Sequence, residues 1–443
     1  MYVADSRASG TAPVSAEPAV RPPAGRRRAV GSTVFALGTV SLITDVSSEM
    51  VTAVLPLYLV AGLGLSPLGF GLLDGVYNGF SALVRLVGGR FADSGGGRHK
   101  TVAVIGYGLS ALCKPLLLLA GTLPLIGAVL AADRTGKGLR TAPRDALISL
   151  SSTPETRGRA FGVHRAMDTA GALLGPLVAF LILRRTVDGY DAVFTVSFCV
   201  AALGVVVLLL FVPRTRGSAP RSPERPDLPA PRQERGELRE QPETTRTRQR
   251  TGPSRALLRI TLCATLLGLA TVSDAFVYLI LQRQLGVPER WFALLPLGTA
   301  AAFLLLAAPL GRLSDRVGAW PVFVGGHIAL LAVYALLLTH AHSPALPCAV
   351  LLLHGTFYAA TDGVLMAAAS AGIPEERRSS GLAVVQTGQA AARFGCSLGF
   401  GAAWTAWGDR TALSVAAVLL VGCVAAVCTL RPAARPAPTK ANA

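Results

Sequence analysis

The sequence predicts an all-α membrane protein in which twelve transmembrane helices form two pseudo-symmetric six-helix bundles. Three observations lead to this prediction. The 443 residues are 51% hydrophobic but only 15% charged, whereas a soluble globular domain carries about 25% charged residues. Long apolar runs follow one another along the whole chain, and two short motifs recur at nearly one offset in its two halves. The composition therefore argues against a soluble enzyme.

The apolar runs are long enough to cross a bilayer, whose hydrocarbon core requires about 20 residues of α-helix. Six runs lie in the first half of the chain and six in the second. We expect spans at residues 34–59, 69–89, 101–119, 123–147, 160–183, 192–212, 257–281, 292–313, 320–339, 346–371, 380–405 and 411–430.

The segments between the spans predict the domain organisation. Residues 31–212 and 256–430 are expected to form the two bundles, joined by a linker at 213–255. The linker contains 11 Arg, 8 Pro and 6 acidic residues, a composition that cannot bury a core. We therefore expect it to be disordered, as are the tails at 1–30 and 431–443.

The basic residues predict the orientation in the membrane. They concentrate in both tails and the linker, whereas the loops at 61–68, 120–122 and 340–345 contain no Lys or Arg. Because cytoplasmic loops are enriched in basic residues, we expect a multi-pass protein of the cell (inner) membrane with both termini cytoplasmic. The basic segments lack interleaved aromatic residues, which argues against a nucleic-acid partner.

Several kinds of chemistry find no support in the sequence. The seven cysteines show no CxxC spacing, and the six histidines are not spaced as metal ligands. No nucleophile has a base at a usable spacing. We therefore expect no enzyme activity, no metal or other cofactor and no obligatory protein partner.

An internal repeat relates the two halves. The motif Gly89-Arg-Phe-Ala-Asp93 follows the second span, and Gly311-Arg-Leu-Ser-Asp315 follows the eighth, 222 residues later. Pro154-Glu-Thr-Arg157 and Pro374-Glu-Glu-Arg377 are offset by 220 residues. A repeat of six spans places a substrate path between the halves, near the midplane of the membrane.

Charged residues inside the spans mark this path. Each ionised side chain at a helix centre costs about 2.5 to 3.5 kcal/mol, so the acids and bases within the spans must pair or face water. Helical spacing places several of them on single faces, as in Asp74, Asn78, Ser81 and Arg85. The candidate cavity residues are Asp74, Asn78, Arg85, Asp133, Lys137, Arg140, Asp274, His354, Tyr358, Asp362, Gln386, Gln389 and Arg393.

A second set of residues has the chemistry of proton transfer. Asp45 and Glu49 lie one turn apart in the first span, and like charges at this distance disfavour joint ionisation. Asp168 follows His164 by one turn in the fifth span, and His164 is a candidate proton relay. An alternative is equally open, in which the acids of the first span form a buried structural pair with Arg134 of the fourth.

The spans, the repeat and the loop motifs together resemble the major facilitator superfamily. The resemblance implies alternating access, in which two bundles rock about a central site and the loop acid Asp93 helps to close the cytoplasmic side. The candidate gate residues are Gly89, Asp93, Arg98, Gly311 and Asp315. Two departures are visible: Ser94-Gly-Gly-Gly97 delays the basic residue that the family carries after the acid, and the second copy has no such residue.

Two further features resemble proton-coupled members of this family. Arg134 resembles a buried arginine that neighbours the proton site. Gly171-Ala-Leu-Leu-Gly175-Pro176 resembles the GxxxGP core of the antiporter motif, in which small residues and Pro let helices approach closely and bend. Ordinary tight helix contact is the alternative explanation for this second feature.

These features predict a proton-coupled exporter of a small organic compound, which exchanges protons for substrate and is driven by the proton gradient. The alternative is proton-coupled uptake or exchange of an anionic metabolite, because Lys137, Arg140 and Arg144 form a cationic stripe. Anion binding requires these cations to be free of acidic partners. A sensor or assembly protein on a transporter scaffold is a rival from another class.

Overall fold

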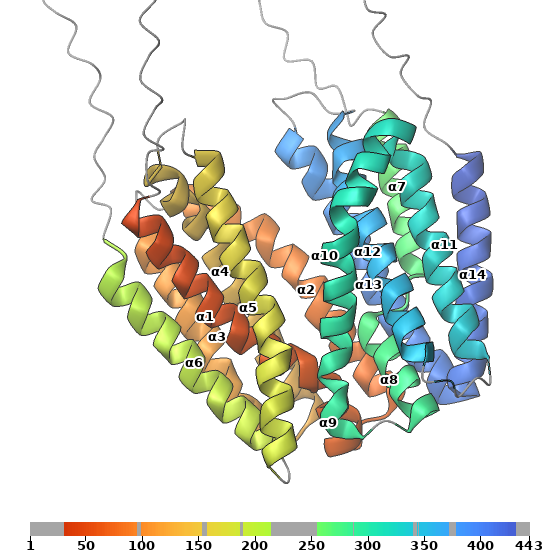
Figure 1. The fold of residues 1–443 in the computed structure, drawn as a ribbon, viewed down its shortest axis with the longest axis horizontal. Coiled ribbons are helices and arrows are strands. Elements are labelled where there is room, and N and C mark those ends of the chain that lie inside the picture. Colours follow the sequence, from red (N-terminus) through yellow and green to blue (C-terminus); the bar gives the residue numbers. More distant parts are fainter. Residues whose placement is uncertain are drawn as a thin grey trace, which may run out of the picture.

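The protein is described by a computed structural model that covers residues 31–94, 99–152, 157–186, 189–213, 255–286, 288–339, 343, 345–371 and 378–430. Within these residues the regular secondary structure is entirely helical, and the helices stand in two groups side by side (Figure 1). The predicted disordered tails and most of the linker lie outside the described residues, as do the motifs around Pro154 and Pro374.

The first group of helices is built by residues 32–211. Its elements are α1 (Ser32–Leu57), the π-helical turn η1 (Tyr58–Gly62), α2 (Pro67–Ser94), α3 (His99–Leu119), α4 (Leu123–Leu150), α5 (Arg157–Arg185) and α6 (Gly189–Phe211). The second group consists of α7 (Arg255–Leu269), α8 (Asp274–Leu285), α9 (Glu289–Phe292), α10 (Leu294–Val317), α11 (Ala319–Leu338), α12 (Ala345–Ala371), α13 (Arg378–Trp407) and α14 (Asp409–Thr429).

The described helices form the twelve predicted spans, because α7 with α8 and α9 with α10 each build one span. Eight spans are long and apolar enough to cross a membrane, and the other four helices, α2, α4, α12 and α13, have 27 to 30 residues. Large apolar side chains such as Leu119, Leu210, Leu305 and Val418 are at least 72% exposed. Such an outer surface suits contact with lipid.

The two six-span groups contact each other in a symmetric way. Span two (α2) packs against span eleven (α13), and span five (α5) packs against span eight (α10). Span eight is the counterpart of span two in the second bundle, and span eleven is the counterpart of span five. Exchanging the two bundles therefore turns one contact into the other. This is the arrangement of two structural repeats related by a pseudo-twofold axis, and it confirms the predicted pair of six-helix bundles.

The two ends of the molecule differ. The start of α1, the end of α6, the start of α7 and the end of α14 lie at one end, which we call the tail end (Figure 1). At the opposite end, the closed end, the bundles are joined directly: Leu68 N donates to Thr405 Oγ1 at 3.0 Å, and Tyr190 Oη donates to Glu289 Oε2 at 2.8 Å.

Backbone contacts reinforce the closed end. Gly401 of α13 lies so near α2 that an added Cβ would be 2.5 Å from the Pro67 carbonyl oxygen and 3.2 Å from Gly71 Cα. A residue with a side chain does not fit at this position without displacing the backbone. The two helices therefore meet here with no side chain between them.

The seventh span is broken, whereas the sequence analysis treats it as continuous. α7 ends at Leu269 and α8 begins at Asp274. Tyr334 Oη of α11 accepts a hydrogen bond from Val272 N at 2.7 Å and donates one to Ala270 O at 3.1 Å. A backbone interrupted within a membrane needs such substitutes for its lost helical hydrogen bonds. The buried tyrosine hydroxyl therefore makes the break stable.

Candidate functional site

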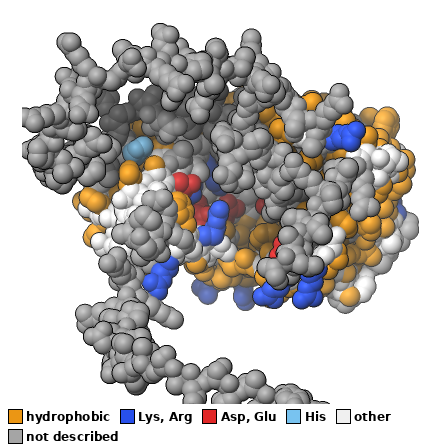
Figure 2. All heavy atoms as spheres, turned by 90° about the horizontal axis from the view of Figure 1, so that it is seen from above, with side chains coloured by type: hydrophobic (Ala, Val, Ile, Leu, Met, Phe, Trp, Pro, Cys, Tyr) orange, Lys and Arg blue, Asp and Glu red, His pale blue; other side chains and the backbone are white. Residues whose placement is uncertain are grey.

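Two adjoining cavities lie between the bundles. The inner cavity, near the closed end, has a volume of about 360 Å³, and the outer one, the vestibule, has about 450 Å³. Glu49, Ala300 and Phe303 line both, so the two spaces are direct neighbours along the interface between the bundles. Seen from the tail end, acidic and basic side chains gather between the two halves of the molecule (Figure 2).

The vestibule is lined by ion pairs between α1 and α4. Arg140 Nη2 lies 3.3 Å from Asp45 Oδ1, and Lys137 Nζ lies 3.7 Å from Glu49 Oε1. The Arg140 side chain is 4% exposed, whereas those of Lys137 and Glu49 are 34% and 27% exposed. The pair at Glu49 is therefore the looser and the more accessible to water.

A second group of charges lies in the same vestibule. Asp168 Oδ1 is 3.6 Å from Arg144 Nη1, and Asp168 Oδ2 is 3.5 Å from Arg165 Nη1. The carboxyl groups of Asp45 and Asp168 also interact electrostatically. Two acids, one from α1 and one from α5, thus line the vestibule together with three arginines.

The glycines of α5 determine where the acids of α1 lie. A Cβ added at Gly171 would be 3.1 Å from Asp45 Cβ, and one added at Gly175 would be 2.7 Å from Glu49 Cβ. Only residues without a side chain allow α1 and α5 to approach this closely. The Gly171 to Pro176 segment therefore lets the two candidate acids of α1, Asp45 and Glu49, lie directly against α5.

Asp133 and Arg134 lie inside the first bundle and line neither large cavity. Asp133 accepts hydrogen bonds from Lys114 Nζ at 2.8 Å, Ser110 Oγ at 2.6 Å and Arg134 Nη2 at 3.0 Å. Arg134 Cζ lies 3.7 Å from the centre of the Tyr77 ring. Asp133, a predicted cavity residue, thus lies under α3, whereas Lys137 and Arg140 of the same helix line the vestibule.

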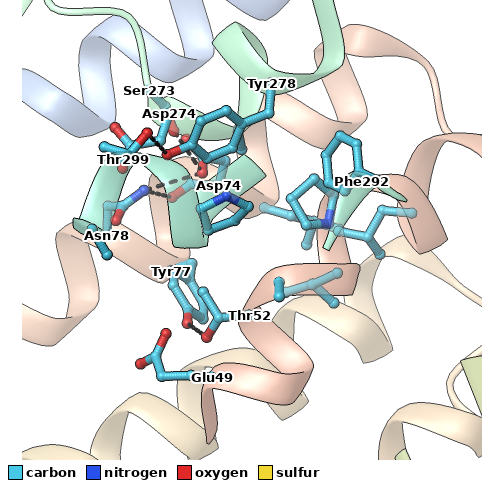
Figure 3. Close-up of a pocket in the computed structure, with 18 of the residues that line it drawn as sticks. Glu49, Thr52, Asp74, Tyr77, Asn78, Ser273, Asp274, Tyr278, Phe292 and Thr299 are labelled. Carbon is cyan, nitrogen blue, oxygen red and sulfur yellow. Dashed lines mark hydrogen bonds between the residues drawn. The ribbon is translucent and has the colours of Figure 1, made fainter. Parts of the chain in front are cut away.

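Asp74 links the bundles at the closed end of the inner cavity. It accepts hydrogen bonds from Ser273 Oγ at 3.0 Å and Asn78 Nδ2 at 3.1 Å (Figure 3). It also accepts one from Ser397 Oγ at 2.6 Å, and both serines belong to the second bundle. Its side chain is buried, and these three donors are uncharged. The acid is therefore held by neutral groups.

Asp274 stands at the break of the seventh span. Tyr358 Oη donates a hydrogen bond to Asp274 Oδ1, and His354 Nε2 lies 3.5 Å from the same oxygen. Arg393 acts electrostatically on Asp274 without lining the cavity. Asp362 also lines the inner cavity, and its side chain is exposed there.

The remaining predicted cavity and relay residues lie away from the path. Gln386 is exposed on α13 and Gln389 is half-buried there, and neither lines a cavity. His354 is fully buried behind Asp274. His164 is buried too, and its two ring nitrogens have no hydrogen-bond partner among the described residues.

The gate motif is described only in part. Gly89 and Asp93 belong to α2, but the side chains of Arg85 and Asp93 lie outside the described part of the chain, as does all of Arg98. In the second copy, Gly311 and Asp315 belong to the last part of α10, and Asp315 is exposed. The gate role of these residues stays a prediction.

The sequence analysis missed several polar side chains of the inner cavity. Ser273, Tyr77, Tyr278 and Thr299 line it, and Tyr278 Oη donates to Thr299 Oγ1 at 2.9 Å. Ser273 immediately before Asp274 carries a visible signal, because Ser followed by an acid marks the start of a helix. Ser397 has no such sequence signal, because its part in the site is a hydrogen bond to Asp74 of the other bundle.

The family model for the Major Facilitator Superfamily matches residues 37–395. The chain belongs to this superfamily. An uncharacterized MFS-type transporter, MJ1317 of Methanocaldococcus jannaschii, is 29% identical over 68% of this chain and 71% of its own length. The multidrug resistance protein MdtH of Photorhabdus laumondii is 30% identical over 41% of this chain and 44% of its own.

Solved structures of the superfamily share the fold. The nucleoside transporter NupG superposes with a TM-score of 0.68 at 14% identity and covers 90% of this chain and 98% of its own. A bacterial homologue of the human lysosomal transporter Spinster, in an inward-facing and unoccupied conformation, has a TM-score of 0.67 at 15% identity, over 90% and 96%. This superfamily member is thus an integral membrane protein of a transporter family with the twelve-helix fold.

Proposed function

We propose that the protein exports a small organic compound in exchange for protons across the cell membrane, by alternating access and without a cofactor. The observation that carries the proposal is the placement of Glu49. Glu49 lines both the inner cavity and the vestibule, next to the other proton-site candidates and next to the proposed space for substrate. This one acid can therefore respond both to a proton and to the substrate.

The vestibule supports proton coupling. Asp45, Glu49 and Asp168 line it beside Lys137 and Arg140. Acids inside a membrane protein that face a water-accessible space are typical of proton pathways. The neighbouring bases can stabilise these carboxylates after a proton has left.

The orientation is part of the proposal. The basic tails and linker join the helices at the tail end, and basic segments favour the cytoplasm. We place both termini in the cytoplasm on this basis. The path between the bundles then opens inward, while the opposite end is closed by the hydrogen bonds from Leu68 and Tyr190.

Proton exchange can be measured in proteoliposomes that hold an imposed pH gradient. Addition of a transported compound is expected to collapse the gradient with the wild-type protein. Asp45→Asn and Glu49→Gln should abolish this collapse and still bind the compound. Normal proton exchange by both variants would refute the proton site.

Anion uptake, the other function that the sequence predicts, has weaker support. It requires free cations, whereas Lys137, Arg140 and Arg144 each lie within 3.7 Å of a carboxylate oxygen. Neutralising Lys137 and Arg140 together would destroy anion uptake if this function were correct. Under the proposed export function, the wild-type protein takes up no anion. The double variant then alters proton coupling only.

A further inference from the structure

We propose that the inner cavity selects organic cations, with an amine or other onium group on an apolar body, as the exported substrate. The inference rests on the proposed export function, because it assigns the substrate class of the same path. It depends on the charge, the aromatic lining and the size of the cavity, which are argued in turn below.

The charge of the inner cavity has one sign. The described residues that line it include four carboxylic acids, Glu49, Asp74, Asp274 and Asp362, and no Lys, Arg or His. The acids come from α1 and α2 in one bundle and from α8 and α12 in the other. A cation between the bundles is thus attracted from both sides, whereas an anion is repelled.

The neighbouring bases offset only part of this charge. Lys137 pairs with Glu49 from the vestibule side at 3.7 Å, and Arg134 pairs with Asp133 inside the first bundle. Arg393 acts on Asp274 from outside the cavity wall. The donors to Asp74 are two serines and an asparagine, so within the described part of the chain this acid has no cationic hydrogen-bond partner.

The second bundle supplies aromatic rings on the cavity wall. Tyr278, Phe292, Phe303 and Tyr358 all line the cavity, and Figure 3 shows Tyr278 close to the Asp74 and Asp274 group. The face of an aromatic ring attracts a cation within about 6 Å of its centre. Rings beside carboxylates are therefore suited to an onium group whose substituents are apolar.

The size of the cavity fits a small organic molecule. Its volume of about 360 Å³ falls in the range of ligand pockets, roughly 300 to 1,000 Å³. Leu73, Leu130 and Pro296 complete an apolar wall around the few polar groups. A bare metal ion would leave most of this wall without contacts, whereas an organic cation uses both the charge and the apolar surface.

The test compares two ions of the same shape and opposite charge. Tetraphenylphosphonium and tetraphenylborate are each titrated into the purified full-length protein in detergent, and binding is measured by equilibrium dialysis. We expect saturable binding of the phosphonium cation, at least about tenfold tighter than that of the borate anion. Equal or tighter binding of the borate overturns the inference.

Variants locate the binding in the inner cavity. Asp274→Asn and Asp362→Asn are each expected to weaken phosphonium binding about tenfold. The matched control is Asp191→Asn, an exposed acid in the first turn of α6 that lines neither cavity and whose variant should bind as the wild type does. Wild-type affinity in both cavity variants refutes the site. Asp362 is exposed to the cavity, so its variant should fold normally, which the elution volume on gel filtration checks.

The binding assay separates this inference from the export function. If the phosphonium cation binds as expected but does not collapse a pH gradient in proteoliposomes, proton exchange fails as the mechanism and the cation site stands. If another compound collapses the gradient while the cation shows no preference over the borate, export stands and the substrate class is wrong.

Discussion

Gly175 of α5 lies directly against Glu49 of α1, so that a Cβ at position 175 would be 2.7 Å from Glu49 Cβ. This close helix contact in the first bundle thus coincides with the acid that lines both cavities. Small residues such as Gly175 ordinarily allow two helices to pack closely. Here they also determine where the Glu49 side chain lies. The geometry of the proposed proton site therefore depends on a residue that carries no functional group.

Gly175→Ala is expected to displace Glu49 and impair proton exchange. Overfilling a tight contact costs about 1 to 3 kcal/mol, so the unfolding midpoint in detergent should also fall. The matched control is Gly162→Ala on the same helix, where an added Cβ meets nothing within 4 Å. If both variants exchange protons equally well, the close contact at Gly175 has no bearing on Glu49.

Tyr334→Phe is expected to destabilise the break in the seventh span. The change leaves Val272 N and Ala270 O without the hydroxyl that satisfies them, and each unsatisfied buried group costs about 1 to 3 kcal/mol. Thermal unfolding in detergent measures the effect. Tyr107→Phe serves as the control, because the buried Tyr107 hydroxyl has no hydrogen-bond partner among the described residues. Equal stability of the two variants would contradict the role of Tyr334.

A disulfide between positions 68 and 405 is expected to stop transport. Leu68 N and Thr405 Oγ1 are 3.0 Å apart across the bundles, and alternating access requires this end to open. The variant Leu68→Cys/Thr405→Cys is made in a protein from which the seven native cysteines have been removed. Oxidation should abolish substrate flux, and reduction should restore it. Each single cysteine variant controls for oxidation, and undiminished flux in the cross-linked protein would rule out opening at this end.

Lys114→Met is expected to destabilise the first bundle strongly. Lys114 is 3% exposed and lies 2.8 Å from Asp133 Oδ1, and loss of one partner from a buried ion pair costs about 3 to 5 kcal/mol. Lys137→Met is the comparison, because its pair with Glu49 is partly exposed and should contribute no more than about 1 kcal/mol. Unfolding midpoints of the two variants should differ clearly. A smaller loss at Lys114 than at Lys137 would reverse the assignment of the structural and the accessible pair.

The twelve spans and the repeat could be predicted because hydrophobic length and motif spacing are properties of the chain itself. Helical spacing also placed Asp74, Lys137 and Arg140 on cavity faces. The same spacing could not tell that Asp133 lies under α3, because the direction of a stripe depends on which neighbour covers it. The break before Asp274 could not be predicted from the sequence for a related reason. The hydroxyl group that stabilises the break belongs to Tyr334, which is more than sixty residues away along the chain.

The contact at Gly401 has a consequence for how the molecule can move. The backbones of the two helices are in direct contact there. No side chains interdigitate at this contact, so none has to move out of a neighbouring space when the helices separate. Such a joint can part and re-form without any change at the glycines themselves, so the resistance to opening comes from the contacts around it, such as the ring of Phe70 against Phe276 and that of Phe180 against Trp291. A single methyl group inserted into the joint would act as a wedge, favouring the conformer in which the two helices stand apart.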